Sequence, residues 1–276
     1  MIPPLTEEVF RQLRDFIYEK SGIFIPDNKK YFLENRLGRR VQEKNLKSYD
    51  DYLYILKYGN DKPELTRLFD MVITNETFFF REPLQFELLT GELLKRVQAE
   101  NKNLTRKDIK IWSAASSTGE EAYTIAMLLT ESPEMKGYTP DIYASDICES
   151  VIASAKNAVY GSYVIRNVPE QYLKKYFAST DQQYQLSPAI KKMVKFSKIN
   201  LFDEKEVKTI RGMDIIFCRN VLIYFDDRAK QKVVSHLYDS LRPGGYLVIG
   251  TSESLHSVTR AFRPVVINKV IIYQKV

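Results

Sequence analysis

The segment from Ile109 to Met127, IKIWSAASSTGEEAYTIAM, constrains the fold more than any other part of the chain. An apolar run that predicts a buried strand leads into a turn of small residues, and then into a helix that opens with Glu120 and Glu121. A strand, a small-residue turn and a helix form the nucleotide-binding unit of doubly wound α/β folds, with the ligand at the carboxyl ends of the strands. Small side chains let the backbone approach such a ligand closely.

The two glutamates indicate the charge of that ligand. A helix N-terminus binds phosphate through bare N–H groups, and two carboxylates at that place would repel it. They would attract a cationic or hydroxyl-rich ligand instead. S-adenosylmethionine carries a sulfonium, an ammonium and no phosphate, and it fits this requirement.

Length and composition favour a two-part protein. The 276 residues are 44% hydrophobic, which suffices for one large domain and a small one. No apolar run approaches the roughly 18 residues of a membrane-spanning helix, and the first residues lack a secretion-signal pattern. Cys148 and Cys218 cannot form a disulfide framework. We therefore expect a cytoplasmic protein without direct membrane insertion.

Hydrophobic periodicity divides the chain at about residue 82. Residues 1–82 carry apolar side chains at spacings of three and four, which predicts an all-helical N-terminal domain of about four helices. Residues 83–276 alternate predicted strands with helices, which indicates an α/β domain with a mostly parallel sheet. Strands are predicted at 109–113, 142–145, 194–198, 213–218, 245–250, 265–267 and 270–273, and helices at 120–129, 149–158 and 227–241. The last two strands form a hairpin, as in class I S-adenosylmethionine-dependent (Rossmann-like) methyltransferases, and residues 160–190 predict a small inserted β subdomain.

Polar residues at predicted strand ends are candidates for the ligand site. Asp146 follows the second strand, where α/β folds bind ribose hydroxyls; the alternative is an N-cap for the next helix. Asn220 and Tyr224 interrupt the apolar run after the fourth strand, and as buried polar groups they would need partners. We expect Asn220 at the methionine end of the ligand, with Tyr224 in the methyl-transfer pocket.

The linker NETFFFRE, residues 75–82, joins the two predicted domains. Its three phenylalanines predict a hydrophobic seam between the domains, while Asn75, Thr77 and Arg81 could reach a ligand at their junction. The Arg81 guanidinium could orient a substrate carboxylate; the alternative is a surface pair with Glu82. Neither histidine has acidic or cysteine neighbours at ligand spacing, so no metal site is expected.

With these residues assembled, the chain resembles the chemotaxis receptor glutamate O-methyltransferase (CheR) family. The resemblance covers nearly the whole length, and its motifs follow the family's order: the 75–81 linker, WSAASSTGEEAY, ASDI, FSKINLF, CRNVLIYF and LRPGGYL. It implies methyl transfer from S-adenosylmethionine, with S-adenosylhomocysteine as product, to glutamate side chains of methyl-accepting chemotaxis receptors. Arg81 and Tyr224 become the candidate catalytic residues. The implied cofactor contacts are Asn75, Thr77, Arg81, Glu121, Asp146, Asn200, Leu201, Asn220 and Val221.

The chain departs from the family in the turn, which usually reads AGCSTGEEPY. Ala115, Ser116 and Ala122 here replace glycine, cysteine and proline. Alanine in place of glycine is expected to tighten the approach of the backbone to the cofactor. These changes keep open a regulatory adaptor that binds S-adenosylmethionine without catalysis.

A basic segment suggests how the substrate docks. Lys29, Arg36, Arg40 and Lys47 recur at spacings of seven, four and seven, which predicts one side of a helix near 29–47. The cytoplasmic helices of receptors carry glutamates, so this side could bind them; the alternative is a solvated charged face. A methyltransferase acting on nucleic acid would also benefit from basic charge, but the chain lacks the Asn/Asp-Pro-Pro-aromatic turn of adenine-directed enzymes at residues 220–223. No nucleic acid partner is expected.

Overall fold

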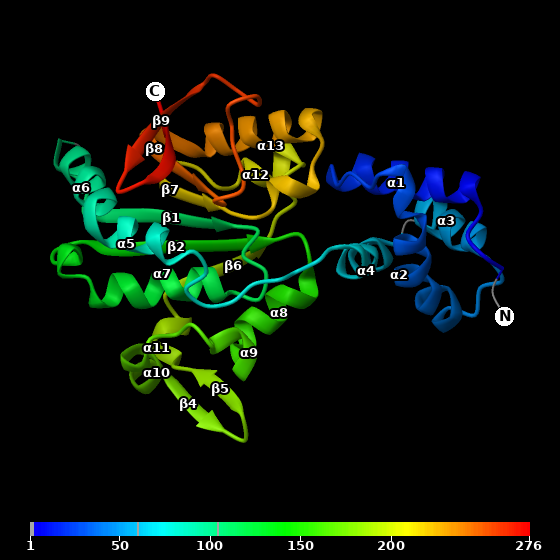
Figure 1. The fold of residues 1–276 in the computed structure, drawn as a ribbon, viewed down its shortest axis with the longest axis horizontal. Coiled ribbons are helices and arrows are strands. Elements are labelled where there is room, and N and C mark those ends of the chain that lie inside the picture. The colour runs from blue at the N-terminus through cyan, green and yellow to red at the C-terminus, as the bar shows by residue number, and fades with distance from the viewer. Residues whose placement is uncertain (1–2, 60, 104) are drawn as a thin grey trace.

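The computed structural model describes residues 3–59, 61–103 and 105–276, and it places a helical N-terminal domain at one end of a larger α/β domain (Figure 1). Polar side chains cap three of its helices where they begin: Thr6 caps the first, Ser48 and Asp51 form a capping box on the third, and Asp61 caps the fourth. These caps bond N–H groups that have no partner within the helix. The elements are α1 (Glu7–Ser21), the 3₁₀ turn η1 (Asp27–Lys29), α2 (Lys30–Glu43), α3 (Tyr49–Tyr58) and α4 (Lys62–Val72). The predicted all-helical character is confirmed.

The basic segment does not form the single charged face that its spacing predicts. Helix α2 ends at Glu43, so Lys47 lies beyond it, and Lys29 belongs to η1. Arg40 donates through Nε and Nη2 to the carboxylate of Glu64 on α4, at 2.9 and 2.6 Å. The prediction of one helix side is wrong, because the helix is shorter and a buried acid from another helix binds one of its charges.

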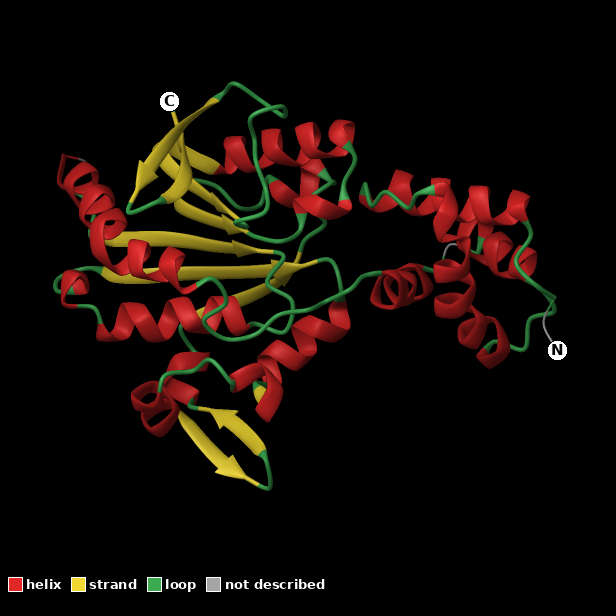
Figure 2. Ribbon diagram, in the orientation of Figure 1, coloured by secondary structure: helices red, strands yellow, loops and turns green. Residues whose placement is uncertain are grey.

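The α/β domain is built on a seven-stranded sheet with the order β6-β2-β1-β7-β8-β10-β9 (Figure 2). Neighbouring strands from β6 to β8 pair in parallel, and β10 pairs antiparallel with β8 and β9. The chain crosses from one side of β1 to the other after β6, which makes a switch point at the carboxyl ends of β1 and β7. The strands are β1 (Asp108–Ala114), β2 (Thr139–Asp146), β6 (Val194–Lys198), β7 (Met213–Cys218), β8 (Leu241–Ile249), β9 (Phe262–Ile267) and β10 (Val270–Lys275).

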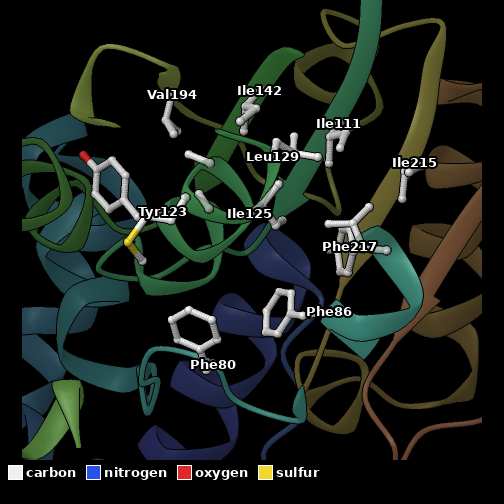
Figure 3. Close-up of a cluster of buried hydrophobic side chains, with 14 of the residues drawn as sticks. Phe80, Phe86, Ile111, Tyr123, Ile125, Leu129, Ile142, Val194, Ile215 and Phe217 are labelled. Carbon is white, nitrogen blue, oxygen red and sulfur yellow. The ribbon is translucent and has the colours of Figure 1, made fainter. Parts of the chain in front are cut away.

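Alternating side chains of the central strands fill two hydrophobic cores. Ile111 and Ile215 face one core, shown in Figure 3, with Phe86 and Ile125 from the covering helices. Trp112 and Ile216 face the other. Helices α5 (Pro83–Leu88), α6 (Leu94–Asn103) and α7 (Glu120–Glu131), with the π-helical turn η2 (Leu89–Leu93), pack on the first face, and α12 (Glu204–Val207) and α13 (Asp227–Ser240) on the second. The sequence pattern predicts no element for the segment from α5 to α6.

An inserted subdomain follows α8 (Glu149–Asn157), as predicted, with a small antiparallel sheet of order β3-β5-β4. The phenylalanines of the linker pack on this subdomain instead of joining the two domains. Phe79 is fully buried. The centre of its ring lies 4.8 Å from that of Tyr160 and 5.3 Å from that of Phe177, and both pairs pack edge to face. The elements of the insertion are β3 (Val159–Gly161), α9 (Ser162–Ile165), α10 (Glu170–Tyr176), β4 (Phe177–Thr180), β5 (Gln183–Leu186) and α11 (Pro188–Lys191).

Specific contacts hold the helical domain at the carboxyl end of the sheet. Ile23 forms an isolated antiparallel bridge with Phe225, and the Asn200 side chain donates to the carbonyl of Lys20 at 2.7 Å. Gly22, which ends α1 at φ 74°, lies so close to Phe202 that a Cβ would be 2.6 Å from its ring. The junction therefore requires a glycine. Within the described ranges, no helix has the length and hydropathy needed to span a bilayer.

Candidate active site

A cavity of about 450 Å³ lies between the helical domain and the carboxyl ends of β1, β2 and β7. Its walls come from the α1–α2 connection, the linker, the turn after β1 and the chain that follows β7. This is the switch point of the sheet, where α/β folds bind their ligands. The volume is in the range of small-molecule sites.

All the residues predicted to contact the cofactor line this one cavity: Asn75, Thr77, Arg81, Glu121, Asp146, Asn200, Leu201, Asn220 and Val221. Tyr224 lines it as well. Of the basic residues predicted to dock the substrate, Lys29 is among the described lining residues. The contacts of these side chains with a ligand remain predictions.

The turn after β1 is held in a strained conformation. Ala115 and Ser117 have φ values of 61° and 50°, in the left-handed region that favours glycine. The N–H of Ser117 donates to Asp146 Oδ2 at 2.9 Å, and the N–H of Cys148 donates to Asp146 Oδ1 at 3.0 Å. Asp146 therefore joins the turns after β1 and β2. Burial raises its pKa, and the two N–H groups oppose that rise.

The structure corrects the alternative role of Asp146. Helix α8 has Cys148 as its N-cap, without a side-chain cap bond. Asp146 lies before the cap, so it is not the N-cap. Its carboxylate lines the cavity, where it is available to hydroxyl groups.

Glu120 and Glu121 do not act as a pair. Glu121 lines the cavity, where it accepts from Ser113 Oγ at 2.7 Å and from Arg219 Nη1 at 2.8 Å. Glu120 is 1% exposed and accepts from Thr118 Oγ1; burial raises its pKa to about 7. The expectation that both carboxylates face the ligand is wrong, because successive helical residues point in different directions.

Arg219 is a site residue that sequence reasoning missed. Its side chain is 2% exposed and forms ion pairs with Glu121 at 2.8 Å and Glu82 at 3.3 Å. The signal was present, because an arginine that directly follows a fully buried strand needs partners if it is buried too. Those partners lie far from Arg219 in the sequence, so the local pattern could not identify them.

Asn220 and Tyr224 are positioned by the chain after β7. Asn220 has φ 58°, and its N–H donates to Glu253 at 2.9 Å while its side chain donates to Glu82 at 3.3 Å. The carbonyl of Tyr224 accepts from the N–H of Phe24, so a contact between the domains fixes this turn. Burial raises the pKa of Tyr224, and the charge of Arg81 opposes that rise.

Arg81 and Asn200 differ in how many of their polar side-chain atoms already bond to the protein. The Arg81 guanidinium lies 5.7 Å from the centre of the Phe78 ring, and its Nη1 donates to the carbonyl of Glu76 at 2.9 Å. These contacts place Arg81 beside the cavity. Asn200 uses both ends of its amide, donating to Lys20 and accepting from the N–H of Phe202 at 3.0 Å. Its side chain stabilises the domain junction.

The cavity suits a polar ligand, because both basic and acidic residues line it. Ser116 Oγ, Ser117 Oγ and Arg219 Nε are buried without a hydrogen-bond partner among the described residues, and all three residues line the cavity. Buried polar atoms are nearly always paired, so these atoms require a polar ligand or water. Three acidic residues line the cavity, Glu76, Glu121 and Asp146, and the last two offer acceptors for hydroxyls and for an ammonium group. The described residues contain no cluster of side chains that could hold a metal ion.

Comparison with known families agrees with this geometry. Residues 8–73 match the family model described as "CheR methyltransferase, all-alpha domain", and residues 75–271 match "CheR methyltransferase, SAM binding domain". The chain belongs to the CheR methyltransferase family. Its cofactor is S-adenosylmethionine, and it is a chemotaxis methyltransferase with the fold that the sequence predicted. The alternatives of a silent adaptor or a nucleic acid methyltransferase are not favoured.

CheR relatives align over most of their own length. The chain is 36% identical to chemotaxis protein methyltransferase 2 of Vibrio cholerae serotype O1, over 94% of this chain and 89% of the relative. It is 35% identical to the chemotaxis protein methyltransferase of Borreliella burgdorferi, over 91% of this chain and 89% of that protein. Identity is again 35% with the enzyme of Vibrio parahaemolyticus serotype O3:K6, over 98% of both chains.

Proposed function

We propose that this methyltransferase forms methyl esters on glutamate side chains of methyl-accepting chemotaxis receptors. The observation that carries the proposal is the make-up of the cavity, whose described lining includes Arg81 and Tyr224 but no histidine. A glutamate with a pKa near 4.3 is almost fully ionised at pH 7, so it is already a nucleophile and needs no general base. A cavity that offers a cation and a hydroxyl suits an anionic acceptor.

The reaction requires positioning and the exclusion of water. S-adenosylmethionine supplies a methyl carbon bonded to a sulfonium. The guanidinium of Arg81 and the hydroxyl of Tyr224 would hold the incoming carboxylate, so that one of its oxygens bonds to that carbon as the bond to sulfur breaks. No proton has to be removed. Shielding the opposite charges from water strengthens their attraction.

We assign the donor side of the cavity to the residues at the strand ends. Asp146 would accept from ribose hydroxyls, and Glu121 and Asn220 would bind the methionine end. The other residues implied by the family resemblance, Asn75, Thr77, Asn200, Leu201 and Val221, would complete the wall around the donor. The unpartnered hydroxyls of Ser116 and Ser117 support this assignment.

The partner would be the cytoplasmic helices of the receptor, so the enzyme would work in the cytoplasm. The boundary between its own two domains would lie at about residue 82. Lys29 at the cavity and Arg36 on α2 are the basic residues best placed to attract an acidic helix. Lys47 lies outside α2, and Arg40 is bound to Glu64, so neither belongs to one continuous docking face.

Incubation with tritiated S-adenosylmethionine and receptor-bearing membranes tests the proposal. We expect the label in base-labile methyl esters on receptor. Arg81→Ala should lower the transfer rate by about 10²–10³-fold, the usual cost of removing a preorganised donor, while S-adenosylhomocysteine still binds. Arg96→Ala, which removes an arginine paired with Glu92 outside the cavity, is the control. Label in nucleic acid, or no label at all, would contradict the proposal.

A further inference from the structure

The backbone on both sides of Arg81 is strained. Phe80 and Glu82, its two neighbours, have φ values of 57° and 60°. A residue with a side chain adopts this left-handed conformation only at an energetic cost. Two such residues in a row of three persist only where the surrounding structure holds them in place.

Glu82 provides one part of that hold. Its carboxylate accepts from the N–H of Thr251 at 3.1 Å and from the side chain of Asn220 at 3.3 Å, and it forms the ion pair with Arg219. Burial alone would raise the pKa of Glu82, but the charge of Arg219 and these hydrogen bonds outweigh it and lower the pKa. Glu82 is therefore ionised at neutral pH.

Arg219 provides the other part. Its Nη2 donates to the carbonyl of Arg81 itself, and its Nη1 is fixed by Glu121 at 2.8 Å. The guanidinium also lies 5.2 Å from the centre of the Phe86 ring. One rigid, planar cation thus connects the donor side of the cavity with the main chain of the linker, and an arginine does this better than a lysine because its donors form a fixed fork.

We propose that Arg219 and Glu82, here called the linker clamp, are positioning residues for methyl transfer that act through Arg81. The clamp holds the strained linker so that the Arg81 guanidinium stays at the cavity, where the proposed function places the acceptor carboxylate. This inference rests on that function for the role of Arg81. The clamp itself touches neither the acceptor nor the transferred methyl group.

Glu82→Gln is the first variant to examine, because it keeps the shape of the side chain and removes its charge. We expect faster amide hydrogen exchange in the peptide that covers residues 76–86. The kcat for receptor methylation should fall about tenfold or more, as expected for a residue that is displaced from the productive geometry. The Kd for S-adenosylhomocysteine should change less than about threefold, since Glu121 keeps its bond to Arg219.

Two further variants separate positioning from simple stability. Arg219→Lys keeps the charge but loses the fork, and should lie between wild type and Glu82→Gln in both exchange and kcat. Glu100→Gln is the matched control: Glu100 pairs with Arg242, whose side chain is 9% exposed, at 2.7 Å, but Glu100 does not line the cavity. It should alter neither linker exchange nor kcat.

A double-mutant cycle with Arg81→Ala gives the decisive result. If the clamp acts through Arg81, adding Glu82→Gln to Arg81→Ala lowers kcat no further. An equal loss in both backgrounds, or unchanged exchange at 76–86, would overturn the inference. If the wild-type enzyme forms no glutamate esters, the proposed function fails, while faster linker exchange in the clamp variants would still show that Arg219 and Glu82 hold the linker.

Discussion

Two buried charge clusters, one in the helical domain and one at the cavity, use the same residue types in opposite proportions. In the first, the carboxylate of Glu64 is 2% exposed and binds Arg40, Lys44 and the hydroxyl of Tyr52. In the second, the guanidinium of Arg219 is 2% exposed and binds two carboxylates, Glu121 and Glu82. Both clusters join segments that are far apart in the sequence.

The two clusters differ in the charge and hydrogen-bonding capacity that remain after their members have paired. Arg40 and Lys44 are 22% and 24% exposed and also pair with Glu43 and Asp61, so their charges are compensated toward the surface and the Glu64 carboxylate is saturated. The surplus at the cavity is negative, and Arg219 Nε beside it has no partner among the described residues. A saturated cluster stabilises the fold, whereas an unsaturated cluster at a cavity still has hydrogen-bonding capacity for a ligand.

The largest expected effect is on stability, from Glu64→Gln. Burial would raise the pKa of Glu64, but hydrogen bonds from Arg40, Lys44 and Tyr52 outweigh it and lower the pKa to about 2. Because the folded-state pKa lies below the unfolded value near 4.3, the wild type gains about 3 kcal/mol that is present above pH 4.3 and lost as the pH falls toward 2.

Urea unfolding at pH 7 should show Glu64→Gln less stable by roughly that 3 kcal/mol. The variant should also lose less stability than wild type between pH 5 and 2, and it should bind S-adenosylhomocysteine normally. Glu43→Gln removes an exposed partner of the same Arg40 and should change little. If Glu64→Gln were as stable as the wild type at pH 7, the Glu64 cluster would not stabilise the fold, and the contrast with the Arg219 cluster would fail.

The sequence predicted most of the α/β architecture because local patterns determine it. Strands at 194–198 and 213–218 have the predicted bounds, since β-branched and aromatic runs there end at polar or turn residues. Strand β8 begins at Leu241, earlier than predicted, because a bulge lets Leu241 pair with Met213 despite the proline that follows. Such pairing depends on the neighbouring strand.

The candidate site was predictable where a motif sits at a strand end, and not where a contact is long-range. Asp146 and Asn220 line the cavity as predicted because the carboxyl ends of parallel strands meet there. Arg40 looked free because its partner Glu64 lies on another helix, and Arg219 was overlooked for the same reason. Glu120 and Glu121 are the same residue type in the sequence, and only the fold gives them different burial and different partners.

The next effect should be on donor binding. Asp146→Ala removes a carboxylate that bonds two turns and faces the cavity. The loss of a charged hydrogen bond should weaken S-adenosylhomocysteine binding by about 1.5–3 kcal/mol. Asp146→Asn, which keeps the shape of the side chain, should recover part of the lost affinity. Calorimetry that gives unchanged affinity for the alanine variant would contradict the assignment.

Adjacent glutamates provide a matched pair for a smaller effect. Glu121→Gln should weaken S-adenosylhomocysteine binding about tenfold, or roughly 1.5 kcal/mol, because a carboxylate that lines the cavity is lost. Glu120→Gln should leave affinity unchanged. Since burial raises the pKa of Glu120 to about 7, wild type should lose stability as the pH rises from 4.3 to 7, and Glu120→Gln should not. Equal loss of affinity in both variants would show that the cavity does not distinguish them.

The smallest effect tests the strain in the cavity wall. Ala115 has φ 61°, in the left-handed region that favours glycine. Ala115→Gly should relieve about 1–2 kcal/mol of strain, of which the greater freedom of the unfolded chain cancels roughly 0.4–1. The melting temperature should then rise by about 1–3 °C. Ala122→Gly is the same substitution inside helix α7, where it should destabilise by about 1 kcal/mol. Opposite signs for the two variants would place the strain in the turn rather than in the helix, whereas a lower melting temperature for Ala115→Gly would show that the turn is relaxed and that alanine suits it.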